Sequence, residues 1–311
     1  MKSEKSKALI ASLLILSSPA LKAANRSVQS EIDEINRLVL QEKGQNSIKV
    51  DWLDKKIEKL GKKVIHEKSE ALKPLGDVVL NSHAPLKTRI FCINFLGLIN
   101  DPGAFTTLSQ VLLDSSQPDA LRSEAASLIS QSPVSISARR QVLCRNLAQK
   151  NLPELTLSQT LFEISRLGCP QTHLLLKQAQ GFGNNPSGKN KVLAILVIKA
   201  LGESFSLNAS KTLWRLFDFY SPGSLLRKEV LKALLKQSRR RLPSSFISLS
   251  QSREAVSAES RFPENETLAL EILARLGGKK AIPDIQRELK NPNPAVREAA
   301  QKALEQARQA P

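Results

Sequence analysis

The residue types that carry most enzyme chemistry are few and scattered in this sequence. The three histidines, His66, His83 and His173, lie far apart, and none has a second kind of metal ligand at helical spacing. A metal site or a histidine acid–base pair would need such a neighbour. The sequence also has no G-x-S-x-G nucleophile motif and no recognisable Cys/His arrangement. We therefore expect no catalytic residue, no metal site and no cofactor, and we predict that the protein is not an enzyme.

One glycine-rich stretch, residues 183–190, comes close to a phosphate-binding loop. Its sequence GNNPSGKN fits the first part of the pattern G-x-x-x-x-G-K-[ST]. Asn190 stands where the pattern needs a hydroxyl that binds magnesium, and the preceding residues 174–177 have a helical pattern, whereas such loops follow a strand. We interpret this stretch as a linker between two helices.

Charge limits the choice of partner more than any motif does. The chain has 46 Lys and Arg against 29 Asp and Glu, a formal net charge of +17, which favours an anionic partner. The densest basic run, residues 239–241, is either part of a binding surface or a solvated loop. The candidate binding residues are Arg139, Arg140, Lys189, Lys191, Arg239, Arg240 and Arg241.

Helices must position these residues. Hydrophobic residues make up 41% of the chain, enough for a large core, but only 4% of residues are aromatic, which argues against sheet. An apolar residue followed by a cation recurs at separations of 35, 105 and 70 residues, all multiples of 35, as in a solenoid. A second marker, Leu-Gly, recurs 105 residues apart at Leu96-Gly97 and Leu201-Gly202. The pairs of the first marker are Leu86-Lys87, Leu121-Arg122, Leu226-Arg227 and Val296-Arg297.

Residues 276–306 show the repeat most clearly, and they resemble a HEAT-like repeat of the type also found in bilin lyases. The resemblance is carried by Leu276-Gly277, Ala281-Ile282-Pro283, Asn291-Pro292, Val296-Arg297 and Ala299-Ala300. It implies an all-α fold, a right-handed α-solenoid of about six to seven HEAT-like helix pairs. For Arg122, Arg227 and Arg297 it implies a structural role, in which the guanidinium packs against an acidic or carbonyl group of a neighbouring repeat.

The cysteines leave two interpretations open. Cys92, Cys144 and Cys169 each lie beside apolar helix positions, and there is no C-x-x-C motif. All three could be buried thiols that act as small hydrophobic side chains. Otherwise one disulfide forms, with Cys144 and Cys169 favoured because they fall in neighbouring repeats.

The amino terminus predicts export. Residues 1–23 read as a signal peptide with a basic start, a short apolar run and small residues before a cleavage site after Ala23; the alternative is a frayed or buried helix. We expect a helical cap over residues 24–63 and the repeats over 64–311, with 238–262 as an irregular repeat or an insertion. Cleavage would remove four lysines and one glutamate, leaving a charge of +14. No membrane-spanning segment is expected after cleavage, and the protein should be periplasmic or secreted.

Three functions remain open at this point. The first is an exported scaffold that binds another protein with an acidic surface through the concave face of the solenoid. The second is binding of a polyanion, either nucleic acid or an anionic envelope polymer, through the basic clusters; the scarcity of aromatic residues argues against nucleic acid. The third is a modifying protein similar to the bilin lyases. The sequence favours the first.

Overall fold

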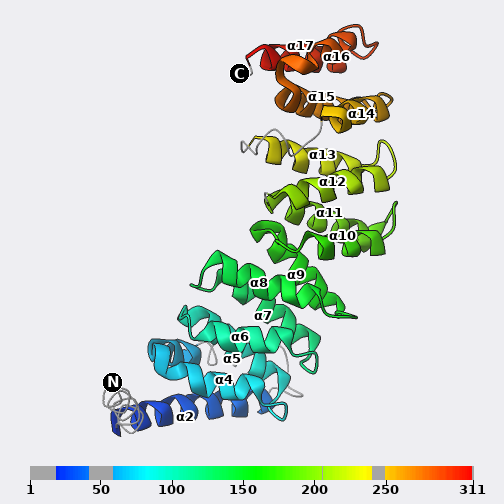
Figure 1. The fold of residues 1–311 in the computed structure, drawn as a ribbon. Coiled ribbons are helices and arrows are strands. Elements are labelled where there is room, and N and C mark those ends of the chain that lie inside the picture. Colours follow the sequence, from blue (N-terminus) through cyan, green and yellow to red (C-terminus); the bar gives the residue numbers. More distant parts are fainter. Residues whose placement is uncertain (1–18, 42–58, 205, 240–248, 310–311) are drawn as a thin grey trace, which may run out of the picture. The chain divides into compact units, whose positions relative to one another are not determined.

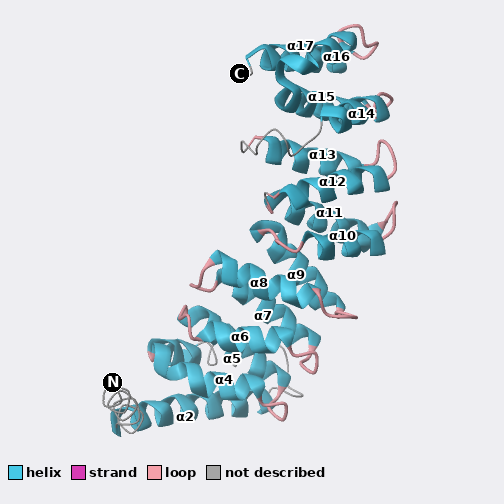
Figure 2. Cartoon of the chain, in the orientation of Figure 1, coloured by secondary structure: helices cyan, strands magenta, loops and turns pink. Residues whose placement is uncertain are grey.

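The computed structural model describes residues 19–41, 59–204, 206–239 and 249–309 (Figure 1). These residues form helices joined by loops, and no strand occurs among them (Figure 2). The prediction of an all-α fold of HEAT-like helix pairs is confirmed. Within the same residues, no helix is both long enough and apolar enough to span a membrane.

The chain divides into two compact units, and each is described by itself. Unit 1 comprises residues 1–142 and 152–156, and unit 2 comprises residues 143–151 and 157–311. In unit 1, two helix pairs follow a short 3-10 helix, and both the first helices and the second helices of the two pairs pack on each other. The elements are η1 (Lys68–Ala71), α4 (Leu72–Leu80), α5 (Leu86–Ile99), α6 (Ala104–Leu113) and α7 (Asp119–Gln131).

The first helix pair of unit 1 is covered by α2 (Pro19–Gln41), which packs on α4, α5 and η1. Val28, Ile32 and Ile35 are buried on one side of α2, as the apolar spacing of this segment dictates. Residues 59–66 are also helical. A signal peptide is expected over residues 1–23. Residues 1–18 lie outside the described residues, and residues 19–23 form the start of α2.

Unit 2 repeats the same arrangement. In each pair a first helix packs on a second helix, and successive second helices α11, α13, α15 and α17 pack on one another. The helices are α10 (Thr172–Gly181), α11 (Gly188–Glu203), α12 (Leu207–Phe219), α13 (Leu225–Ser238), α14 (Leu249–Ala258), α15 (Pro263–Gly277), η3 (Gly278–Ala281), α16 (Ile282–Glu288) and α17 (Pro294–Gln309). We call the side of unit 2 formed by α11, α13, α15 and α17 the second-helix face.

One further pair, α8 (Ile136–Leu147) and α9 (Glu154–Leu167), runs through both units. Within unit 2 its two helices are joined by a buried hydrogen bond of 2.9 Å from Asn146 Nδ2 to Thr160 Oγ1. The described residues thus contain seven helix pairs, from α4–α5 to α16–α17.

The serine-rich tract at residues 238–262 contains a helix that the sequence analysis did not predict. α14 lies in this tract and packs on α15 as the first helix of a pair. Its inner side consists of small residues, Ser252, Ala255 and Val256, so the apolar spacing that marks the other helices is weak here.

Candidate functional site

One surface feature of unit 2 is a groove between α11 and α13 on the second-helix face. It has a volume of about 280 Å³. Its floor is apolar and its rim carries lysines and glutamates. The lining residues are Ser165, Ile198, Lys199, Gly202, Glu203, Glu229, Lys232, Ala233 and Lys236.

Small residues create the floor of this groove. A Cβ atom on Gly202 would lie 3.2 Å from the Cβ atom of Ala233, so the two helices approach closely at this point. Ile198 is fully buried beside them. Because no long side chain rises between α11 and α13 here, an apolar side chain from outside can reach the floor.

The rim keeps an excess of positive charge. Lys236 forms an ion pair with Glu203 on the neighbouring helix, and Lys232 Nζ lies 2.7 Å from Glu229 Oε1 on its own helix. Lys199 is exposed and has no ion-pair partner in the described part of the chain. Three lysines therefore face two glutamates, and the groove attracts a carboxylate most strongly at Lys199.

A second groove lies farther along the same face, between α15 and α17. Leu268, Ala299 and Ala303 are among its lining residues, together with Glu271 and Lys302. Glu271 accepts hydrogen bonds from Arg239 at 3.2 Å and from Arg275 at 3.1 Å. The second-helix face thus has two grooves with apolar lining residues. Beside them, Lys199, Lys232, Lys236, Arg239 and Arg275 outnumber the carboxylates of Glu203, Glu229 and Glu271.

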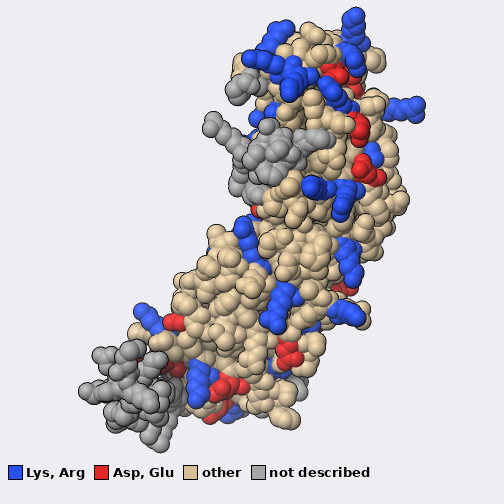
Figure 3. Space-filling view, in the orientation of Figure 1, with Lys and Arg blue, Asp and Glu red and all other residues tan. Residues whose placement is uncertain are grey.

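The basic residues predicted from the sequence are not gathered into one site. In unit 1, Arg139 donates to the backbone carbonyl of Ser130, and Arg140 follows it on α8. In unit 2, Lys189 and Lys191 lie at the start of α11 and Arg239 lies just after the end of α13, so they occupy opposite ends of the second helices. Arg240 and Arg241 lie outside the described residues. Lys and Arg side chains occur alongside acidic ones on the face drawn in Figure 3.

The repeat arginines close their own helix pairs. Arg122 Nε donates to the carbonyl of Leu112 at 3.1 Å, Arg227 Nε to Tyr220 at 2.8 Å, and Arg297 Nη1 to Asn291 at 2.8 Å. In each case an arginine near the start of the second helix binds a carbonyl at or after the end of the first helix. Carbonyls at a helix end have no partner within the helix, so this arginine position has the same role in these three pairs.

The corresponding residue of the α4–α5 pair is Arg89, which the sequence analysis missed. Arg89 Nε donates to the carbonyl of Val79 at 2.8 Å, and both bonds, Arg89 to Val79 and Arg122 to Leu112, span ten residues. Lys87, which the 35-residue spacing selects, instead has its Nζ atom 5.6 Å from the centre of the Phe91 ring. The spacing from Arg89 to Arg122 is 122 − 89 = 33 residues, two fewer than the period of 35, so the fixed period selects Lys87 instead.

Two of these arginines, Arg89 and Arg227, also reach the next helix pair. Arg89 Nη2 donates to Gln117 in unit 1. In unit 2, Arg227 Nη1 binds Glu259 Oε1 at 2.6 Å, and Glu259 Oε2 accepts from the backbone N–H of Gly223 at 3.0 Å and from Asn265 Nδ2 at 2.8 Å. These contacts link one pair to the next by buried polar groups.

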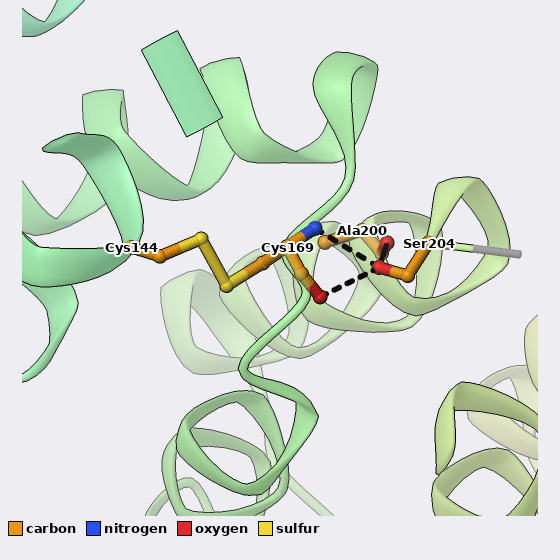
Figure 4. The surroundings of a disulfide bond; sticks show 4 residues. All are labelled: Cys144, Cys169, Ala200 and Ser204. Carbon is orange, nitrogen blue, oxygen red and sulfur yellow. Dashed lines mark hydrogen bonds between the residues drawn. A yellow bond between two sulfur atoms is a disulfide. The ribbon is translucent and has the colours of Figure 1, made fainter. Parts of the chain in front are cut away.

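A disulfide lies near the end of α11 (Figure 4). Cys144 and Cys169 are paired, with their Cα atoms 6.0 Å apart, and both are fully buried. The backbone of Cys169 contacts the hydroxyl of Ser204 at the end of α11. Cys92 is buried and not in a disulfide, and burial raises the pKa of its thiol to about 12. Of the two interpretations left open by the sequence, the structure has the disulfide.

The described residues include no group of three or more His, Cys, Asp or Glu side chains placed to hold a metal ion. No protein-family model matches the chain. No curated protein matches it either.

Among solved structures, the chain is similar to human deoxyhypusine hydroxylase in complex with glycerol, an all-helical protein with HEAT-like repeats. The match has 15% sequence identity, covers 90% of this chain and 96% of the other, and has a TM-score of 0.37. Because this neighbour is an enzyme, the prediction that the chain is not an enzyme is contradicted and we do not retain it. The likeness is too distant to transfer an activity to this chain.

Proposed function

We propose that this protein is an exported HEAT-like repeat scaffold that binds an acidic segment of another protein on the second-helix face of unit 2. The observation that carries the proposal is the groove between α11 and α13, with its apolar floor and its uncompensated Lys199. A partner segment that carries one apolar side chain beside a carboxylate would fill the groove and neutralise its rim.

The overall charge supports the same type of partner. The chain keeps a formal charge of +14 if residues 1–23 are removed. Positive charge of this size accelerates encounter with acidic proteins and makes the complex sensitive to salt.

The disulfide supports export. Disulfides persist in oxidising compartments and are rare in the cytosol, and the structure pairs Cys144 with Cys169. The apolar run near the amino terminus supports the same localisation. Export is tested by comparing the amino terminus of the protein recovered from the envelope with the encoded one.

The binding experiment is affinity capture from a nuclease-treated envelope extract at low and at high salt, using residues 24–311 as bait. The groove variant carries Lys199→Glu and Lys232→Glu. The matched control carries Lys150→Glu and Lys177→Glu, two exposed lysines that do not line the groove. A third variant, Arg239→Glu with Arg240→Glu and Arg241→Glu, tests the arginine run.

We expect the wild type and the matched control to capture the same partner at low salt and the groove variant to lose it. Equal capture by the groove variant and the wild type would overturn the proposal. Capture that occurs from an untreated extract and disappears after nuclease treatment would instead identify nucleic acid as the ligand.

A further inference from the structure

We propose that the Cys144–Cys169 disulfide assembles the groove between α11 and α13, so that the protein acquires its binding surface only when these two thiols are oxidised. The inference concerns the regulation of the groove and rests on the function proposed for it. It follows from a continuous series of contacts within unit 2, from the disulfide to the rim of the groove.

The first contact fixes the loop that follows α9. Cys144 lies on α8, and Cys169 lies two residues after the last residue of α9. The disulfide therefore ties this loop to the preceding helix of the same pair. Both residues are fully buried, so the loop is held from the inside of the unit.

The second contact joins this loop to the end of α11 (Figure 4). The hydroxyl of Ser204 accepts a hydrogen bond from the backbone N–H of Cys169 at 2.9 Å. It also lies 2.9 Å from the carbonyl oxygen of Cys169 and 2.7 Å from that of Ala200. One hydroxyl thus connects the disulfide-bonded residue to the last turn of α11.

The third contact is made by the backbone of Gly168. This glycine has φ +79°, and a Cβ atom there would lie 2.8 Å from the carbonyl oxygen of Glu203. The loop backbone therefore rests directly on Glu203, a position that only glycine fits without strain. Displacement of the loop therefore removes a backbone contact that supports Glu203.

Glu203 completes the series because its carboxylate forms the ion pair with Lys236 on the groove rim. Gly202, the residue before it, is part of the groove floor. The α11 end is thus held from two sides, by α13 through a buried hydrogen bond of 2.9 Å from Gln237 Nε2 to the carbonyl of Leu201, and by the loop at residues 168–169, which the disulfide fixes.

The redox step is an exchange with a disulfide-bearing oxidant. The Cys144 and Cys169 thiols lose two protons and two electrons and form the S–S bond, and the oxidant is reduced to two thiols. Cys92 is buried on α5 in unit 1 and is not in a disulfide. Before export the chain would be reduced and its groove loosely held, so partner binding would await oxidation.

The experiment compares the oxidised chain, the dithiothreitol-reduced chain and the variants Cys144→Ser, Cys169→Ser and Ser204→Ala. Cys92→Ser is the matched control, because it removes a buried thiol outside the disulfide. The first readout is amide hydrogen exchange at residues 200–204. Residues 269–274 on α15 serve as the internal reference. The second readout is the affinity for a fluorescent peptide of alternating Glu and Leu.

We expect exchange at residues 200–204 to become about tenfold faster after reduction and in both cysteine variants, because the loss of one or two hydrogen bonds has an effect of this order. Ser204→Ala should show the same acceleration with its disulfide intact. Exchange at residues 269–274 on α15 should be the same in every form. Cys92→Ser should match the oxidised wild type both in exchange at residues 200–204 and in peptide affinity. The peptide should bind about tenfold more weakly to every form with faster exchange.

Unchanged exchange at residues 200–204 after reduction would overturn the inference, whatever the peptide does. Faster exchange with equal peptide affinity in both redox states would also overturn it, because the disulfide would then act only on stability. If exchange accelerates but no form binds the peptide, the proposed groove function fails while the link from the disulfide to α11 is supported.

Discussion

Arg227 and Glu259 form a buried ion pair between two consecutive helix pairs of unit 2. Their Nη1 and Oε1 atoms are 2.6 Å apart, and the side chains are 9% and 0% exposed. The guanidinium also lies over the Phe217 ring, 4.3 Å from its centre. Since Arg227 Nε binds the carbonyl of Tyr220, one side chain closes its own pair and binds the next.

Removing the carboxylate of this pair should destabilise the protein strongly. Glu259→Ala leaves a buried guanidinium without its counter-charge, and breaking such a pair costs about 3–5 kcal/mol. We expect this loss in the free energy of unfolding, measured by urea denaturation. Lys302→Ala is the control, because its pair with Glu298 is exposed and exposed pairs contribute little. Equal effects of the two substitutions would show that the buried pair does not hold the helix pairs together.

The repeat register can be tested in unit 1. Arg89 is buried and binds both the Val79 carbonyl and Gln117, so Arg89→Ala should cost about 2–4 kcal/mol through lost charge-assisted hydrogen bonds and packing. Lys87→Ala should cost about 0.5–1 kcal/mol, the value of an exposed cation–π contact. The free energies of unfolding of both variants, measured by urea denaturation, show which of the two residues holds the repeat position. A larger loss for Lys87→Ala would restore the register that the 35-residue spacing indicates.

The sequence predicted what depends on local spacing. Apolar residues at helical intervals predict helices such as α4 and α6, because each of these helices has one buried side. The same rule failed at α14, whose buried side is formed by Ser252, Ala255 and Val256. A fixed period also misplaced the arginine of the α4–α5 pair, because loops differ in length between repeats.

The groove was beyond the reach of sequence patterns. Its rim residues Lys199 and Lys232 are 33 positions apart in the sequence, and they meet only because α11 stacks on α13. Likewise, nothing around Glu259 marks it as the partner of Arg227. Spacing identified the arginines that recur, but not the residues they contact, because those contacts depend on how consecutive pairs stack.

Asp119 should contribute stability that is sensitive to acid. Its carboxylate accepts from the backbone N–H groups of Leu155 and Thr156 at 3.1 and 2.8 Å, so it caps the start of α9. Burial raises the pKa of Asp119, but the hydrogen bonds from Thr156 and Leu155 outweigh burial, so the pKa of this carboxyl lies below its usual range in the folded protein. Asp119→Ala should cost about 0.5–2 kcal/mol, as for other lost helix caps.

Because the pKa of Asp119 is lower in the folded state, its contribution is fully present above about pH 4 and is lost as pH falls through the folded pKa. Urea denaturation at pH 7 and at pH 3 measures this. The difference between Asp119→Ala and wild type should shrink at the lower pH. Asp77→Ala, at an exposed residue of α4, is the control and should show little difference at either pH.

Glu266 should make the last helix pair more stable in mild acid than at alkaline pH. It is buried on α15, where its Oε1 atom accepts from Asn291 Nδ2 at 2.9 Å, and the same amide reaches Glu288 Oε2 at 2.8 Å. Burial, followed by the hydrogen bond and the negative charge of Glu288, raises the pKa of Glu266 to about 7. The folded protein therefore holds a proton that the unfolded chain releases near pH 4.5.

It follows that the stability contributed by the protonated form is complete below about pH 4.5 and is lost as pH rises towards 7. Glu266→Gln keeps the acceptor for Asn291 and cannot ionise, so the variant should gain stability relative to wild type at pH 8 and little at pH 4.5. Urea denaturation at the two pH values measures this difference. Glu264→Gln is the control, because the hydrogen bond and charge of Lys228 lower the pKa of Glu264, so its titration falls below this range. An equal difference between Glu266→Gln and wild type at both pH values would contradict the raised pKa of Glu266 in the folded protein.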